Sequence, residues 1–125
     1  MKISEALTRI DGLKPNTFGD DEKIEWLSRL DARIHGEILM THEHEPEEET
    51  FAGYSAATDD DTELLAKHPY DSLYIYYMES QIDYYNGEMA KFNNSAAMFN
   101  SAYGDYANYI NRTKMPLGKA EMRYF

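Results

Sequence analysis

The chain of 125 residues contains no cysteine, which excludes disulfides and thiolate metal sites and fits a reducing compartment. It also has no apolar run that approaches the roughly 20 residues of a membrane-spanning helix. The opening segment MKISEALTRIDGL carries charges throughout and lacks the apolar run of a signal peptide. We therefore expect a soluble protein that makes no membrane contact and stays in the cytoplasm of the cell that makes it.

Positive charge is scarce, with 12 Lys and Arg against 23 Asp and Glu and a formal net charge of −11. Direct binding to nucleic acid requires a basic footprint, so this acidity disfavours sequence-specific nucleic-acid binding. The sequence also lacks a phosphate-binding glycine loop and a nucleophile elbow. We predict no enzymatic activity, no catalytic residues and no cofactor.

The hydrophobic periodicity predicts an all-α fold. In the second of four predicted helices, apolar residues recur at spacings of three and four, which is the pattern of an amphipathic helix: Ile24, Leu27, Leu30, Ile34 and Ile38. The predicted helices cover residues 4–11, 20–41, 71–92 and 95–112. We expect residues 1–125 to form a single domain, a small bundle of three main helices with a short N-terminal helix.

Nine of the eleven tyrosines lie between Tyr70 and Arg112. The pair Asn93-Asn94 predicts a junction between two helices here, because Asn tolerates left-handed backbone geometry at a helix end. Ser95 then predicts the N-cap of the second helix.

The predicted helix 71–92 is apolar over more than half of its circumference, so it must be covered from two sides, by its own fold or by another subunit. Five residues advance along nearly one line of this helix and form the candidate subunit interface: Tyr74, Met78, Gln81, Tyr85 and Glu88. Two interpretations of its polar members stay open. Gln81 and Glu88 lie at the helix margin and reach water, or they form hydrogen bonds across a subunit interface.

Residues 42–63 hold nine acidic residues and no Lys or Arg, and they predict a long acidic loop. Within it, Phe51, Gly53 and Tyr54 form an apolar island that we expect to pin the loop to a surface.

His42 and His44 lie two residues apart, whereas the zinc protease motif needs a spacing of four on a helix. We therefore predict no metal site and interpret the run as a solvated group of charges.

Residues 113–125 predict a flexible C-terminal tail, because Pro116 and Gly118 stop any helix. The tail is locally basic and ends on aromatic residues. Two interpretations are open, a frayed terminus or a segment that docks on a partner. The candidate docking residues are Lys114, Lys119, Arg123, Tyr124 and Phe125.

Three runs of the sequence carry a resemblance to a known family: ISEALTRIDGLKPN, DEKIEWLSRLDARIHGEI and YNGEMAKFNNSAAMFNSAYGDYANYINRTKMP. Together they resemble small head–tail connector (adaptor) proteins of tailed phages and prophages of Gram-positive bacteria. The resemblance covers roughly residues 2–41 and 64–116. It is a pattern of residues rather than a catalytic motif, and it does not extend to the acidic loop.

The resemblance implies a mostly α-helical structural virion protein that is made in the bacterial host cytoplasm and located at the head–tail junction. There it would form a ring under the portal, extend the DNA channel and receive neck or tail proteins.

Two alternatives from other classes remain. One is an acidic DNA mimic or regulatory inhibitor that binds a basic partner through residues 47–49 and 59–61. The other is a metal-dependent enzyme that uses His42, His44 and nearby carboxylates.

Overall fold

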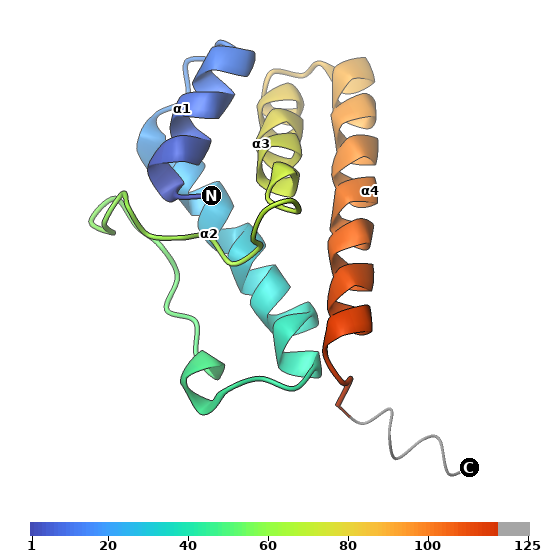
Figure 1. Ribbon diagram of the computed structural model, residues 1–125. Coiled ribbons are helices and arrows are strands. Elements are labelled where there is room, and N and C mark those ends of the chain that lie inside the picture. Colours follow the sequence, from blue (N-terminus) through green and yellow to red (C-terminus); the bar gives the residue numbers. More distant parts are fainter. Residues whose placement is uncertain (118–125) are drawn as a thin grey trace.

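The computed structural model describes residues 1–117 and is mostly helical, which confirms the all-α prediction. Four α-helices and two single turns of 3₁₀-helix follow one another along the chain, and residues 1–117 contain no strand (Figure 1): α1 (Ile3–Leu13), α2 (Asp20–Glu37), η1 (Leu39–Thr41), η2 (Pro46–Glu48), α3 (Ser72–Tyr85) and α4 (Met89–Thr113).

Helix α3 lies at the centre of the arrangement. It pairs with α4 in a hairpin of two antiparallel helices, and it also packs against α1 and α2 (Figure 1). The turn between α3 and α4 lies at one end of the molecule, and η1, η2 and the end of α4 lie at the other. A helix with neighbours on several sides must be apolar around much of its circumference, which explains the broad apolar surface of α3.

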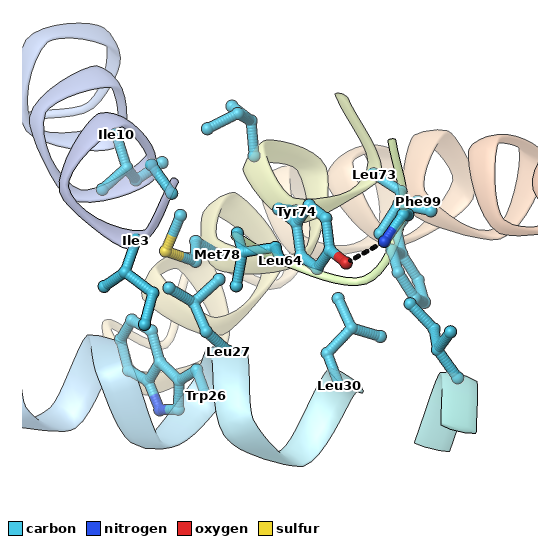
Figure 2. Packing of buried hydrophobic residues seen from close by; sticks show 14 of the residues in the cluster. Ile3, Ile10, Trp26, Leu27, Leu30, Leu64, Leu73, Tyr74, Met78 and Phe99 are labelled. Carbon is cyan, nitrogen blue, oxygen red and sulfur yellow. Dashed lines mark hydrogen bonds between the residues drawn. The ribbon is translucent and has the colours of Figure 1, made fainter. Parts of the chain in front are cut away.

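One hydrophobic cluster draws on all four α-helices and on the segment before α3. Five side chains have no exposed surface at all and pack around the first half of α3 (Figure 2): Leu27, Leu64, Leu73, Tyr74 and Met78. Trp26 is also buried, although it stands one step off the apolar stripe of α2. Burial of these side chains is the main term that stabilises the arrangement.

The junction between the last two helices lies at Asn86–Glu88, and the prediction that Asn93-Asn94 forms it is wrong. Gly87 has a φ of 73°, the left-handed conformation that favours glycine just beyond a helix end. Asn93 and Asn94 are exposed within α4. Ser95 caps no helix, because its hydroxyl is buried and donates to Asp83 Oδ2 at 2.9 Å.

The other helix bounds differ less from those predicted. α1 begins and ends one or two residues beyond 4–11, and α2 ends at Glu37 rather than at residue 41. Of the remaining residues of that prediction, Leu39–Thr41 form the 3₁₀ turn η1. A last turn that tightens into 3₁₀ geometry is common at helix ends.

Two glycine substitutions test the new junction. Gly87→Ala should lower the free energy of unfolding by about 1 kcal/mol, because alanine pays a steric cost at positive φ. Gly104→Ala, within α4, should raise it by about 0.5–1 kcal/mol, because a new Cβ there meets no atom within 4 Å and alanine favours the helix. Urea unfolding followed by circular dichroism measures both. Equal effects of the two changes would contradict the assignment of the junction.

Candidate functional site

The five residues of the predicted interface do not share one surface. Tyr74 and Met78 are completely buried, Gln81 is partly exposed, and Tyr85 and Glu88 are exposed. This corrects the prediction for Tyr74 and Met78. The part of α3 that carries them is enclosed by the other helices, so neither side chain is available to a neighbouring subunit. The exposed part of the predicted line is confined to the end of α3 and the turn that follows it.

Tyr74 instead belongs to a buried polar network centred on Asp31 of α2. The Tyr74 hydroxyl donates to Asp31 Oδ1 at 2.6 Å. The same hydroxyl accepts the Ala66 N–H at 2.7 Å, the bond drawn as a dashed line in Figure 2. The Tyr54 hydroxyl and the Leu65 N–H donate to Asp31 Oδ2 at 2.6 and 3.1 Å. Each buried polar group therefore has a partner, which is what allows a carboxylate to lie in a protein core.

Burial raises the pKa of Asp31, and the hydrogen bonds from Tyr54, Tyr74 and Leu65 oppose that rise. Burial and the adjacent carboxylate also raise the pKa values of Tyr54 and Tyr74, so both phenols remain protonated donors. The network fixes the segment 54–66 to α2 and α3. Within the acidic segment, Tyr54 therefore makes a direct contact with α2.

The raised pKa of Asp31 has a consequence for stability. The folded protein holds the Asp31 proton more tightly than the unfolded chain, so the Asp31 contribution is greatest below its ordinary pKa of 3.8 and falls as the pH rises through the folded pKa. Asp31→Asn cannot titrate in this range. The free energy of unfolding of the wild type, minus that of Asp31→Asn, should therefore decrease as the pH rises from 3.8. Urea unfolding over a pH series measures this difference, and an increase would contradict the pKa shift.

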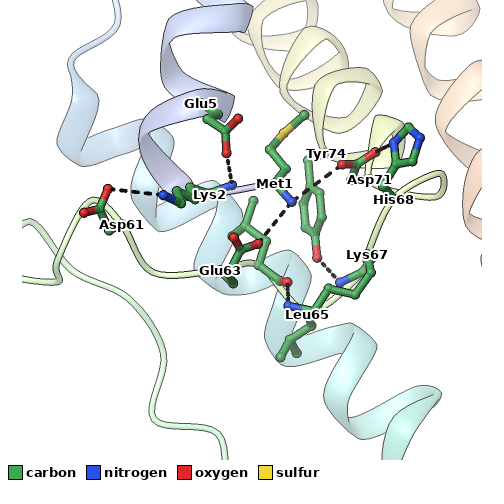
Figure 3. Close-up of polar contacts among 12 residues, drawn as sticks. Met1, Lys2, Glu5, Asp61, Glu63, Leu65, Lys67, His68, Asp71 and Tyr74 are labelled. Atoms are coloured by element: carbon green, nitrogen blue, oxygen red, sulfur yellow. Dashed lines mark hydrogen bonds and ion pairs between the residues drawn. The ribbon is translucent and has the colours of Figure 1, made fainter.

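The far end of the acidic segment is held against α1 by polar contacts around the first residues (Figure 3). The Met1 amino group lies 3.3 Å from Glu63 Oε2 and 3.6 Å from Asp71 Oδ2. The Ile3 N–H donates to the Thr62 carbonyl, and the Leu64 N–H donates to the Met1 carbonyl. Residues 42–63 contain no α-helix, but the segment is attached to the helical core at Tyr54 and again at residues 62–63.

An aromatic cluster lies at the end of the molecule that carries the α3–α4 turn, and we call it the tip cluster. The centroids of its neighbouring rings lie 5.3–6.1 Å apart. Tyr84 and Tyr85 are each more than half exposed, and Tyr85 stacks on buried Trp26 with an interplanar angle of 7°. The members of the tip cluster are Phe18, Trp26, Tyr84, Tyr85 and Phe92.

The tip cluster is a surface suited to protein contacts. Tyrosine buries a large ring yet keeps a polar group in water, so it tolerates exposure before a partner binds. Met89, which directly follows the turn, adds a further exposed apolar side chain. Sequence reasoning found Tyr85, but it placed Phe18 in no site and Phe92 inside the preceding helix. The pairing of Phe18 with Tyr85 joins segments far apart in the sequence and leaves no local signal.

The opposite end of the molecule carries a hollow of 720 Å³ between the acidic segment and the end of α4. We call it the acidic hollow. It is lined by Glu43, His44, Glu45, Glu48, Glu49, Thr113, Lys114 and Leu117. A hydrogen bond to the His42 carbonyl and another to Glu49 raise the pKa of His44.

The two histidines that suggested a metal site point to different partners. His42 is buried, with Nδ1 at 2.6 Å from the Ile38 carbonyl and Nε2 at 2.7 Å from Asn111 Oδ1. His44 faces Glu49 instead. Within residues 1–117, no group of three or more His, Cys, Asp or Glu side chains is arranged to hold a metal ion.

The first part of the predicted tail is attached to its own chain. The Glu43 N–H donates to the Met115 carbonyl, and the Leu117 N–H donates to the Thr41 carbonyl. Lys114 is half-buried at the rim of the acidic hollow. The other candidate docking residues lie outside the described residues: Lys119, Arg123, Tyr124 and Phe125.

Over residues 1–117, no helix combines the length and the apolar character that crossing a membrane requires. Comparison of the chain with protein-family models, with curated proteins and with solved structures gave no match.

Proposed function

We propose that this protein is a non-enzymatic head–tail connector of a tailed phage or prophage, which assembles as a ring under the portal and joins it to neck or tail proteins. The proposal starts from the residue pattern that resembles this family. The observation that carries it is that two chemically different surfaces, the tip cluster and the acidic hollow, lie at opposite ends of one small helical domain.

Two different surfaces are what a ring with stacked partners requires. Ring closure uses a heterologous contact, in which one patch of a subunit meets a different patch of the next. A connector must in addition present a surface to the component above or below it. Exposed tyrosines such as Tyr84 and Tyr85 suit such contacts, because aromatic residues are enriched in protein interfaces.

The charge of the chain fits a structure through which DNA passes. With a formal net charge of −11, a ring of many copies would be strongly acidic. Acidic walls repel phosphate groups, so DNA would move through the channel without being held. The protein would act at the head–tail junction of the virion after synthesis in the host cytoplasm, with copies of itself, the portal and neck or tail proteins as partners.

The test is the assembly state of the purified full chain. Light scattering over a range of concentrations should show a discrete oligomer, and electron microscopy should show closed rings with a central channel. An open filament, or a compact dimer without a channel, would contradict the connector function. Stable binding to a basic protein with no self-association would favour an acidic inhibitor instead.

A further inference from the structure

His44, in the lining of the acidic hollow, has both of its ring nitrogens against oxygen acceptors. Its Nδ1 lies 2.7 Å from the His42 carbonyl oxygen, and its Nε2 lies 2.6 Å from Glu49 Oε1. A carbonyl and an ionised carboxylate can only accept, so each ring nitrogen must supply an N–H. A neutral imidazole carries one N–H and would set its other lone pair against an oxygen. The two bonds therefore form together only when His44 is an imidazolium.

The other three histidines of the chain do not require a charge in this way. Within residues 1–117, His35 has one hydrogen-bond partner, a backbone carbonyl that a neutral ring satisfies. His42 lies between a carbonyl and the Asn111 side chain, whose amide offers both a donor and an acceptor to the ring. His68 is exposed, so water can meet its ring nitrogens. The need for a protonated ring is thus specific to His44.

The contact between His44 and Glu49 closes a short loop, residues 44–49, which contains the 3₁₀ turn η2. None of residues 44–49 is buried, so apolar packing contributes little to holding this loop in place. Inside the loop, the Glu45 N–H donates to Glu48 Oε1 and the Glu48 N–H donates to the Glu45 carbonyl. On the side of α2, His35 Nε2 lies 2.8 Å from the Glu48 carbonyl. The His44–Glu49 pair is the contact that joins the two ends of the loop.

The charges around His44 make this contact sensitive to pH. The hydrogen bond to the His42 carbonyl, and next the one to Glu49, raise the pKa of His44 above its ordinary value of 6.5. A raised pKa means that the contact is fully present below pH 6.5 and is lost as the pH rises through the folded pKa. The ionisable groups that line the hollow with His44 are four carboxylates and one cation: Glu43, Glu45, Glu48, Glu49 and Lys114.

We propose that His44 is a pH-dependent latch on the acidic hollow. As an imidazolium it bonds to Glu49 and to the His42 carbonyl and holds residues 44–49 closed. When the proton leaves to water, the neutral ring can keep only one of the two bonds, and the loop opens. The hollow then also loses its histidine cation, so the remaining glutamates repel one another more strongly. This inference does not depend on the proposed connector function.

Electron paramagnetic resonance of a spin label on the loop tests the latch in the full chain. The protein has no cysteine, so Glu47→Cys provides a single labelling site at an exposed position between the two ends of the loop. The mobile component of the spectrum should increase severalfold from about pH 5.5 to about pH 8.5, because the freed loop moves on the nanosecond timescale. The midpoint should lie above pH 6.5. A label at Asn108→Cys, exposed on α4, should show no such change.

Three substitutions in the chain labelled at residue 47 identify the group responsible. Glu49→Gln should keep the loop ordered at both pH values, because an amide can accept from the imidazolium or donate to the neutral ring. His44→Gln should leave the loop mobile at both, because the ring that bridges its two ends is gone. Glu43→Gln, the matched control, removes a carboxylate from the same hollow but leaves both His44 bonds, so it should respond to pH as the wild type does.

The outcomes that contradict the latch are distinct from those that bear on assembly. A spectrum at residue 47 that does not change with pH, or a midpoint at or below pH 6.5, would overturn it. A full pH response in Glu49→Gln or in His44→Gln would also overturn it, because another group would then be titrating. Loss of the response in Glu43→Gln would assign it to the summed charge of the hollow rather than to the latch. The measurement works on a monomer and on a ring alike, so failure of the connector function would leave it intact.

Discussion

Replacing Asp31 with alanine is expected to lower the free energy of unfolding by about 3–5 kcal/mol, because one buried and two partly buried donors lose their acceptor at once. The Tyr54 and Tyr74 hydroxyls and the Leu65 N–H all point at this carboxylate. Asp31 and Tyr74 have no exposed surface, so water cannot replace the missing oxygen atoms without entering the core. The small gain in helix propensity from alanine is several times smaller than this loss.

Urea unfolding followed by circular dichroism measures the effect, with Glu25→Ala as the matched control. Glu25 lies on the same helix, but it is exposed and pairs with the equally exposed Arg29, so its removal should change the free energy of unfolding by less than about 0.5 kcal/mol. Tyr54→Phe removes one donor and keeps the carboxylate, and it should cost about 1 kcal/mol. This milder variant keeps the network testable if Asp31→Ala does not fold. If the Asp31 network did not stabilise the fold, Asp31→Ala, Tyr54→Phe and Glu25→Ala would all change the free energy of unfolding by similar small amounts.

The existence of the helices could be predicted from the sequence, because apolar residues at spacings of three and four report directly on a buried helix face. The junction between α3 and α4 could not be placed in this way. Asn86-Gly87 and Asn93-Asn94 are both helix-ending signals, and they lie seven residues apart. Tertiary contacts decide between them. Ser95 bonds to Asp83, which also pairs with Lys14 ahead of α2, and this requires Ser95 to lie inside a helix packed on α3.

The candidate surfaces were predictable only in part, because burial depends on which elements cover a face. Tyr74, Met78 and Tyr85 fall on one line of a helix, and nothing local distinguishes them. The structure covers the first two with α1 and α2 and leaves Tyr85 beyond the covered region. The Asp31 network gave no sequence signal, because its partners lie 23, 34 and 43 residues further along the chain.

Replacing Tyr85 with aspartate should block assembly of the proposed ring while leaving the monomer folded. Tyr85 is 54% exposed and is the member of the tip cluster that belongs both to the predicted interface and to the exposed surface. A partner that covers Tyr85 would have to bury the new carboxylate without a cation to pair with it, which typically costs several kcal/mol. In the monomer the same carboxylate stays in water. The fold then loses only the stacking on Trp26, worth about 1 kcal/mol.

Light scattering reports assembly, and circular dichroism with thermal unfolding reports the fold. Tyr85→Phe should assemble normally, because it keeps the ring on Trp26, and Met98→Asp places the same charge at another exposed apolar side chain of the α3–α4 hairpin. If Tyr85→Asp unfolds the chain, the tip cluster belongs to the monomer core rather than to an interface. If Tyr85→Asp assembles as well as Tyr85→Phe, the ring contact excludes the tip cluster. If Met98→Asp blocks assembly equally, the contact extends along α4, because a charge distant from the aromatic rings then has the same effect.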